Sequence, residues 1–325
     1  MRDKIIETIL NNQDEFISGE ELSKQLGISR AAVWKHIKVL KEQGYNIESV
    51  NKKGYRLVKK PDDLLTYNNI CHELDTNFMG RRIEHFDTIN STNDYAKSIA
   101  SESLDGTIII SEEQTKGKGR LGRQWHSKSS EGIWMSAILK PNISPYKAPF
   151  ITLIAGASIV SALNKLGVSS QIKWPNDIII NNKKVAGILT ELSAEIERIN
   201  YIVLGIGINV KTMEFSQEIS EIATSLYKEN YRISRVDIVR SIIVEFERLY
   251  LEYINKGLKE STLEICREYS AIIGKEIYIL QGDSKELVRC IDINDQGNLV
   301  IKDNSDKTRE IMSGEVSIRG VKGYV

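Results

Sequence analysis

Three apolar runs constrain the fold of this chain most strongly. They occupy residues 107–111, 133–139 and 201–208, and short runs of this kind are typical of strands buried inside a sheet. Two longer stretches, 151–166 and 236–253, repeat apolar side chains at helical spacing. The combination predicts an α/β domain in the middle of the chain.

The order of the strands predicts the kind of sheet. Residues 172–181 and 184–193 have the composition of two strands that follow one another across Asn181 and Asn182. Asparagine favours tight hairpin turns, and hairpins join antiparallel strands. We therefore expect a mixed or antiparallel sheet over residues 66–270, and not the doubly wound parallel sheet of dinucleotide-binding folds.

Length and charge limit the possible functions. A chain of 325 residues is longer than one usual hydrophobic core, so two or three domains are expected. The 44 Lys and Arg residues balance 44 Asp and Glu residues, which gives a formal net charge of zero. Affinity for phosphates or nucleic acids must therefore come from local basic patches.

The cysteines and the lack of export signals indicate an intracellular protein. Cys71, Cys266 and Cys290 are odd in number, far apart and without a Cys-x-x-Cys pair, which argues against a disulfide framework or a zinc site. The first residues lack the long apolar run of a signal peptide, and we expect no stretch to approach the length of a membrane span. The expected location is the cytoplasm.

Residues 1–60 predict a helix-turn-helix. A first helix is expected from an apolar stripe that consists of Ile5, Ile6, Ile9 and Leu10. Ser18 and Glu21 form a capping box for a second helix, which should end near Gly27. After this turn Ser29 caps a third helix, whose buried face consists of Val33, Ile37 and Leu40.

The third helix and the segment after it carry positive charge. Residues 46–58 predict a hairpin with a basic tip at 51–54, which is called a wing. Residues 22–45 resemble the winged helix-turn-helix of bacterial regulators, whose exposed side chains meet phosphates and base edges. The expected DNA-binding residues are Ser29, Arg30, Ala31, Trp34, Lys35, Lys38, Lys52 and Lys53. A small helical bundle with solvated lysines is the alternative.

A basic glycine-rich loop occupies residues 116–123, where three glycines and four cations make up most of the sequence KGKGRLGR. Glycines favour neither helix nor strand and let main-chain N–H groups converge on an anion. Lys118, Arg120 and Arg123 add charge, so a phosphate-bearing ligand is predicted. The loop fits neither the Walker A pattern nor a Gly-x-Gly-x-x-Gly that opens a helix. A flexible basic surface loop is the alternative.

Four further motifs accompany the glycine loop in a fixed order. "STN" at 91–93 precedes the loop, and "KWPNDIII" at 173–180, "KKVAGILTEL" at 183–192 and "GIGIN" at 205–209 follow it. Each motif alone is an ordinary cap, turn or strand. Together and in this order they resemble bacterial biotin-protein ligases. With the winged domain in front, the chain resembles those ligases that also repress biotin operons.

The resemblance implies three domains. Residues 1–60 would be the winged helix-turn-helix DNA-binding domain, and residues 66–270 the catalytic domain that binds biotin and ATP. Residues 271–325 would form a small SH3-like β-barrel, in agreement with the short apolar runs of that segment. A polar stretch with a proline at 59–63 has the composition of a linker.

The resemblance also implies a function, that of a biotin–[acetyl-CoA-carboxylase] ligase. ATP would activate biotin as biotinyl-5′-AMP, with Mg²⁺ present, and the biotinyl group would pass to a lysine of a biotin carboxyl carrier domain. A homodimer that forms when biotinyl-AMP is bound would repress biotin genes at operator DNA, without any membrane partner. A ligand-sensing transcription factor without catalysis, or a relative of the lipoyl or octanoyl transferases, are the alternatives.

Site residues follow from the resemblance, position by position. Lys184, Arg120 and Asp177 would be catalytic, with the Lys184 ammonium between the biotin carboxylate and the α-phosphate. The implied biotin-binding residues are Ser91, Thr92, Asn93, Gln114, Lys118, Gly119, Arg120 and Lys184. The implied ATP- and adenylate-binding residues are Gly117, Lys118, Arg120, Arg123, Lys173, Asn176 and Asn209. Lys118 stands where the family has Arg, which keeps the charge but loses the planar fork.

Some of these roles stay open. Asp177 could orient Lys184 or receive a magnesium ion that accompanies ATP. Trp125 and Trp134 could line the biotin pocket or pack in the core. Asn209 could cap the nucleotide or form a turn at the end of a strand.

Overall fold

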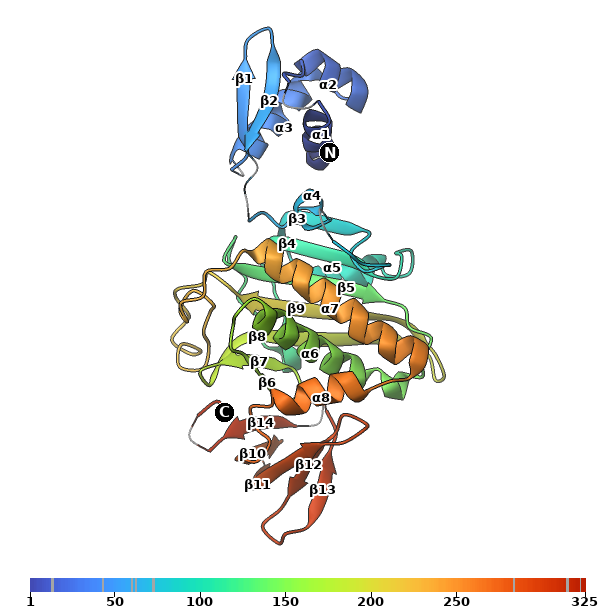
Figure 1. The fold of residues 1–325 in the computed structure, drawn as a ribbon, viewed down its shortest axis with the longest axis vertical. Coiled ribbons are helices and arrows are strands. Elements are labelled where there is room, and N and C mark those ends of the chain that lie inside the picture. The colour runs from blue at the N-terminus through green and yellow to red at the C-terminus, as the bar shows by residue number, and fades with distance from the viewer. Residues whose placement is uncertain are drawn as a thin grey trace. The chain divides into compact units, whose positions relative to one another are not determined.

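The computed structural model describes the chain except for residues 13, 14, 43, 60, 62, 72, 73, 283, 314, 315 and 322. It consists of two compact units, Met1–His72 and Glu73–Val325 (Figure 1). The polar stretch expected as a linker lies within the first unit, and its residues 60 and 62 lie outside the described part.

The first unit is a winged helix-turn-helix. Its elements are α1 (Arg2–Leu10), α2 (Gly19–Leu26), α3 (Arg30–Glu42), the antiparallel hairpin of β1 (Asn46–Val50) and β2 (Gly54–Lys59), and α4 (Tyr67–Cys71). The Ser18 hydroxyl accepts the Glu21 N–H at 3.0 Å, and Gly27 ends α2 with a φ of 65°. Ser29 accepts the Ala32 N–H at 3.2 Å. The predicted caps are therefore confirmed.

The core of this unit confirms the predicted helix faces, with one correction. The expected residues of α1 and α3 are buried, namely Ile5, Ile6, Ile9, Val33, Ile37 and Leu40. Leu10, which the stripe included, is instead 38% exposed. It lies about 40° beyond Ile6 around the helix, at the edge of the stripe and in the last turn. An edge position is not covered by the neighbouring helices.

The second unit is built on a mixed seven-stranded sheet. In sheet order its strands are β3 (Ile83–Ile89), β4 (Thr107–Gln114), β5 (Gly132–Leu139), β9 (Ile199–Asn209), β8 (Lys183–Ala194), β7 (Asp177–Ile180) and β6 (Gln171–Lys173). β3 and β4 are parallel, and the other neighbours are antiparallel. Asn181 and Asn182 join β7 to β8 with φ values of 48° and 61°. Asparagine tolerates this left-handed region better than most residues, which explains the predicted hairpin.

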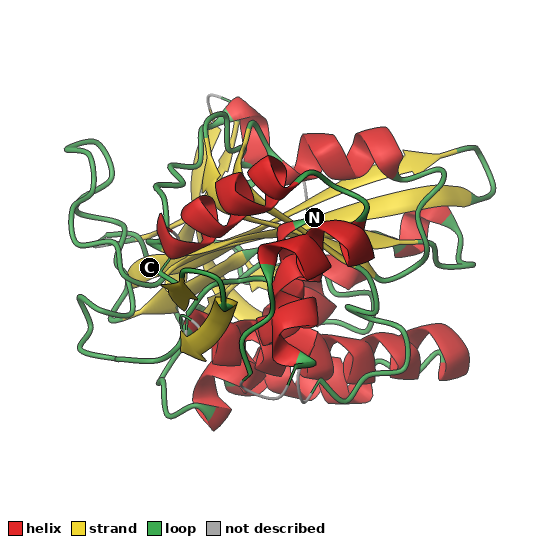
Figure 2. Ribbon diagram, turned by 90° about the horizontal axis from the view of Figure 1, so that it is seen from above, coloured by secondary structure: helices red, strands yellow, loops and turns green. Residues whose placement is uncertain are grey.

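Helices cover both faces of this sheet. Met135 and Ala137 of β5 face Phe246 of α7 (Arg235–Lys256), whereas Ile138 packs with Ala96 of α5 (Thr92–Ile99). Since side chains alternate along a strand, α7 and α5 lie on opposite faces. Figure 1 draws α6 (Pro149–Lys165) beside α7 in front of the sheet. In the view from above in Figure 2, a row of helices runs below the strands.

Helix α6 corrects the expectation about membrane-spanning segments. Together with the 3₁₀ turn Pro145–Lys147 it forms a helical stretch of 21 residues that is long and apolar enough to cross a membrane. However, 72% of its most apolar window is buried inside the protein. We therefore assign it as a core helix, whose all-round apolar surface is explained by its contacts with the sheet, with α7 and with α8 (Glu260–Glu268).

A five-stranded antiparallel sheet ends the second unit. In sheet order it consists of β13 (Thr308–Ile311), β12 (Leu299–Lys302), β11 (Ser284–Ile293), β10 (Glu276–Gln281) and β14 (Ser317–Gly320). It packs on the central part beside α8 (Glu260–Glu268). The Trp174 Nε1–H donates to the Gly297 carbonyl at 3.0 Å, and Arg267 Nε lies 2.9 Å from Asp292 Oδ1. These contacts attach the C-terminal sheet to α8 and to the turn between β6 and β7.

Candidate active site

A cavity of about 540 Å³ opens on the face of the central sheet that α5 covers. This volume lies within the range of small-molecule sites. The glycine loop, the start of α5, the turn between β6 and β7, and β8 and β9 form its walls. Residues of segment 212–223 and of the C-terminal sheet complete it. Stretches that lie far apart in the sequence therefore meet around one space.

A network of polar side chains occupies the end of the cavity at the start of α5. Ser91 caps this helix, and the Thr92 N–H donates to Gln114 Oε1 at 2.8 Å. The hydroxyl of Ser136 lies 2.7 Å from Thr92 Oγ1 and 2.6 Å from Asn93 Oδ1. These buried groups hold one another in fixed orientations, which suits the recognition of a small polar head group.

Glycines of the sheet leave room for this network and for an indole ring. A Cβ at Gly205 would lie 2.2 Å from Asn93 Oδ1, and one at Gly207 would lie 2.7 Å from the ring of Trp125. Trp125 lines the cavity, whereas Trp134 is only 1% exposed and belongs to the core. Of the two alternatives for these tryptophans, the pocket position therefore holds for Trp125 and the core position for Trp134.

The glycine loop closes on itself beside the cavity. The Trp125 N–H donates to the Gly117 carbonyl at 2.9 Å, and the Gly119 N–H donates to the Arg123 carbonyl at 2.7 Å. A Cβ at Gly117 would lie 2.4 Å from the Trp125 carbonyl, so only glycine fits this approach. The 3₁₀ turn η1 (Arg120–Gly122) forms the tip of the loop.

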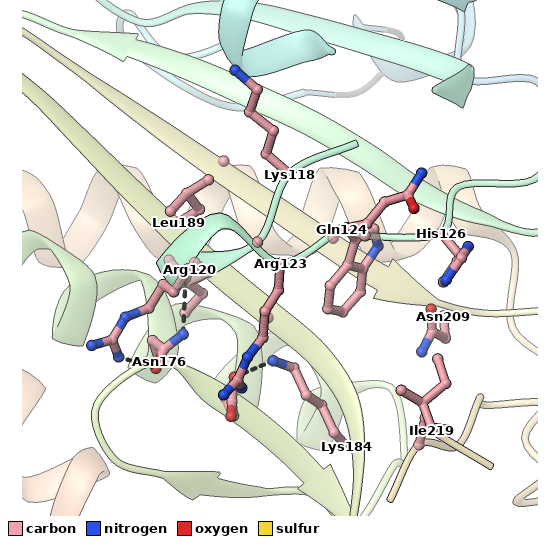
Figure 3. A pocket seen from close by; sticks show the side chains of 18 of the residues that line it. Lys118, Arg120, Arg123, Gln124, His126, Asn176, Lys184, Leu189, Asn209 and Ile219 are labelled. Carbon is pink, nitrogen blue, oxygen red and sulfur yellow. Dashed lines mark hydrogen bonds and ion pairs between the residues drawn. The ribbon is translucent and has the colours of Figure 1, made fainter. Parts of the chain in front are cut away.

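The cations of the loop do not all face the same way. Arg120 Nη1 donates to Asn176 Oδ1 at 2.7 Å, and Figure 3 shows Arg123 directed toward Lys184. Lys118 points away from these groups, and its ammonium lies 2.7 Å from Asp94 Oδ1 on α5. Burial would raise the pKa of Asp94, but the hydrogen bond from Lys118 helps to lower it. Lys118 thus fastens the loop to α5.

A half-buried ion pair lies at the opposite end of the cavity. Lys184 Nζ lies 2.5 Å from Asp177 Oδ1 and 5.2 Å from the centre of the Trp125 ring. The Tyr324 hydroxyl donates to the other oxygen of Asp177. Burial raises the pKa of Asp177, but the charge of Lys184 and the hydrogen bonds from Lys184 and Tyr324 more than offset this and lower it. Asp177 is therefore a carboxylate that holds Lys184.

Lys173 is an unusual cation of the same region. Its side chain is 2% exposed, and its Nζ has no hydrogen-bond partner among the residues that the structure describes. The Nζ atom lies 3.3 Å from the centre of the Tyr324 ring. Burial lowers the pKa of Lys173 to about 7. This amine lines the cavity and is positioned to gain an anionic partner.

Three protein-family models match the chain. The Biotin/lipoate A/B protein ligase family matches residues 85–209, an HTH domain matches 2–56, and the Biotin protein ligase C terminal domain matches 272–319. The bifunctional ligase/repressor BirA of Bacillus subtilis (strain 168) is 37% identical over 323 residues, which cover 98% of each chain. This chain belongs to the BirA family of bifunctional ligase/repressors.

Another BirA relative and a solved ligase structure support this family assignment. BirA of Escherichia coli (strain K12) is 30% identical over 98% of this chain and 97% of its own. The biotin protein ligase from Aquifex aeolicus in complex with biotin and ATP has a TM-score of 0.64 at 28% identity. The match covers 74% of this chain and 99% of that one. The predicted ligase/repressor family is confirmed, and similarity along the whole chain decides against a lipoyl or octanoyl transferase relative.

The cavity of this BirA-family chain is lined by nearly all the binding residues that the resemblance implied, and also by residues that it did not imply. Every implied biotin- and nucleotide-binding residue lines it except Gly117, which shapes the loop behind Trp125. Asn209 lines the cavity and donates to the Thr224 carbonyl at 3.1 Å. Sequence reasoning missed the walls formed by segment 212–223 and by Val316, Ser317, Ile318, Arg319 and Tyr324. Nothing in their spacing links these residues to the glycine loop.

Proposed function

We propose that this BirA-family chain joins biotin to ATP as biotinyl-5′-AMP and transfers the biotinyl group to a lysine of a biotin carboxyl carrier domain. It also represses biotin genes by binding operator DNA. One observation carries the catalytic half: a single cavity has a fixed polar network at one end and Arg120, Lys184 and Lys173 at the other. A neutral ring system and a phosphate group would fit such a site together.

The polar network is suited to the ureido head group of biotin. Asn93 offers a carbonyl oxygen and an amide, and Thr92 offers a hydroxyl, so both the N–H groups and the C=O of a urea would find partners. Ser136 and Glu191 hold Asn93 at 2.6 Å and 2.8 Å. The indole of Trp125 would cover the apolar part of the ligand.

Gly205→Ala is expected to weaken biotin binding at least about tenfold. The new methyl group would displace Asn93, whose amide is held on both sides, and the loss of one hydrogen bond is worth roughly 1.4 kcal/mol. The measurement is calorimetric titration with biotin. Gly156→Ala on α6 is the matched control, since its Cβ would meet nothing closer than 3.8 Å. Equal biotin affinity in Gly205→Ala and the unchanged chain would contradict this assignment.

Adenylation brings two anions together. A biotin carboxylate oxygen attacks the α-phosphorus of ATP, the bond from that phosphorus to the bridging oxygen breaks, and pyrophosphate leaves. Lys184 and Arg120 would reduce the repulsion and stabilise the charge on the phosphorus oxygens, with Arg123 beside them. In the second step the neutral amine of the acceptor lysine attacks the carbonyl carbon, and AMP leaves. Closure of the glycine loop would exclude water from the mixed anhydride.

Magnesium has no site of its own in these side chains. No group of three or more His, Cys, Asp or Glu within the described residues could hold a metal ion. Lys184 and Tyr324 already engage both oxygens of Asp177. We therefore assign to Asp177 the role of orienting Lys184, and a magnesium ion that enters with ATP would be held by the phosphates and water.

The winged unit supports the repressor half of the proposal. All eight residues expected to contact DNA are exposed, and they lie on the start and outer face of α3 and at the tip of the β1–β2 hairpin. Trp34 is 60% exposed, which is unusual for a tryptophan outside a binding surface. We propose that a homodimer with bound biotinyl-AMP is the DNA-binding form, and that the protein acts in the cytoplasm.

The direct test of the ligase uses the complete chain with ATP, labelled biotin and a purified biotin carboxyl carrier domain. Label should appear on the carrier only when ATP is present. A carrier whose acceptor lysine is replaced by arginine should stay unlabelled. Absence of label on the intact carrier would contradict the ligase assignment.

A chain that begins at residue 66 is expected to keep ligase activity and lose operator binding. The proposed catalytic domain 66–270 and C-terminal domain 271–325 hold every residue that lines the cavity. The Aquifex aeolicus ligase, which matches 74% of this chain, provides a precedent for such a length. Adenylate formation and operator binding are measured after a cooperative thermal melt has shown that the shortened chain folds. A folded but inactive product would contradict this modular division.

A further inference from the structure

Tyr324 and Val325, which follow β14, lie back against its last residue, Gly320. The Gly320 N–H donates to the Tyr324 carbonyl at 3.4 Å, and a Cβ at Gly320 would lie 2.1 Å from the carbonyl carbon of Val325. A side chain at position 320 would therefore prevent this return. Tyr324 is only 7% exposed and lines the cavity, although it comes from the C-terminal part of the unit.

The phenol of Tyr324 completes the surroundings of the ion pair between Lys184 and Asp177. It donates a hydrogen bond to Asp177 Oδ2, while Lys184 lies 2.5 Å from Asp177 Oδ1. The Tyr324 ring also covers Lys173 Nζ, which is 3.3 Å from the ring centre, and the Arg319 guanidinium lies 5.1 Å from that centre. One aromatic side chain thus touches the carboxylate and two cations.

We propose that Tyr324 is a positioning residue for the adenylation step, which acts on Lys184 through Asp177. This inference rests on the proposed function. A carboxylate held at only one oxygen can rotate about its χ2 angle and carry its partner ammonium with it. With the second oxygen fixed by the phenol, Asp177 keeps the Lys184 ammonium at one place in the cavity. Tyr324, from the C-terminal part of the unit, therefore contributes to catalysis although its hydroxyl touches no reacting atom.

The ring of Tyr324 has a second effect that is separable from its hydroxyl. It lies over Lys173 and excludes water from this side of the cavity. Tyr324→Phe removes only the hydrogen bond, whereas Tyr324→Ala also exposes the buried Lys173 amine and the Lys184–Asp177 ion pair to more water. The rate of adenylation should therefore fall in the order unchanged chain, Tyr324→Phe, Tyr324→Ala.

Removal of the hydroxyl should also change the pH dependence. The hydrogen bond from Tyr324 lowers the pKa of Asp177, so its loss raises that pKa. Asp177 would then be protonated at a higher pH, and the acidic fall in rate would move to higher pH. The other charged groups around Asp177 stay the same in Tyr324→Phe; among the described residues they include Lys184 on β8, Lys173 on β6 and Arg120 in the loop, and Arg123 and Arg319 act on Lys173 and Tyr324 next to it.

The test is a single-turnover measurement of biotinyl-adenylate formation by the complete chain, over a range of pH, with biotin affinity measured in parallel. Tyr324→Phe should slow the step about tenfold at saturating biotin and ATP, with biotin affinity unchanged within about threefold. Tyr253→Phe is the matched control, because this buried tyrosine on α7 also loses one hydroxyl hydrogen bond, to the Lys147 carbonyl at 3.2 Å, away from the cavity.

The outcomes separate the two levels of the proposal. An unchanged chain that forms no adenylate would overturn the proposed function and this inference with it. Normal activity in the unchanged chain, with the same rate and pH profile in Tyr324→Phe, would overturn the inference alone. An equal loss in Tyr253→Phe, or a parallel loss of biotin affinity in Tyr324→Phe, would reduce Tyr324 to a structural residue and overturn it as well.

Discussion

Lys184→Ala is expected to slow biotinyl-adenylate formation by about 100- to 1000-fold, which corresponds to roughly 3–4 kcal/mol of transition-state stabilisation. The ammonium is half-buried between Asp177 and the Trp125 ring, at the cationic end of the cavity. Charge develops on the phosphorus oxygens only during the reaction, so biotin affinity should change far less than the rate. The measurement is single-turnover adenylation at saturating ATP.

Two further variants make this result interpretable. Lys183→Ala changes the neighbouring lysine, which does not line the cavity, and should leave the rate unchanged. Lys184→Arg keeps a cation beside the half-buried Asp177, so it should melt like the unchanged chain even if Lys184→Ala is less stable. A rate of adenylation in Lys184→Ala equal to that of Lys183→Ala would remove Lys184 from the chemical step.

Operator DNA is expected to bind about 5- to 150-fold more tightly when biotin and ATP are present, the usual range for coupling between two sites. The proposed dimer would present two α3 helices to two half-sites on one duplex. An adenylate that orders the glycine loop would lower the entropy cost of dimerisation. Affinity in both states should fall steeply with salt, because lysines on α3 and the wing replace counterions on phosphates.

The measurement is a titration of operator DNA at fixed salt, with sedimentation of the free protein. Lys184→Ala supplies the matched control: biotin plus ATP should no longer increase its operator affinity, whereas added biotinyl-AMP should. By reciprocity, operator DNA must tighten adenylate binding by the same factor. Equal operator affinity and equal mass with and without the substrates would show that the winged unit is not regulated by the cavity.

Local features of this protein could be predicted from the sequence, because their causes lie within a few residues. Ser18 caps α2 through the N–H three positions later, and Asn181 and Asn182 allow the positive φ angles of the β7–β8 hairpin. Strands and helices follow from the spacing of apolar side chains. The motifs that contribute biotin- and phosphate-binding groups are also local, so their order along the chain was sufficient to indicate the BirA family.

Only the tertiary structure decided which groups meet. Lys118 and Arg120 are only two positions apart in the loop. Nevertheless, Lys118 pairs with Asp94 on α5, whereas Arg120 donates a hydrogen bond to Asn176. Tyr324 reaches Asp177 across 147 positions of sequence because the C-terminal sheet packs against the turn between β6 and β7. Such contacts depend on how whole elements pack and on the direction each side chain takes from its backbone. Residue types in a sequence determine what chemistry is available, whereas packing determines which of those groups share one cavity.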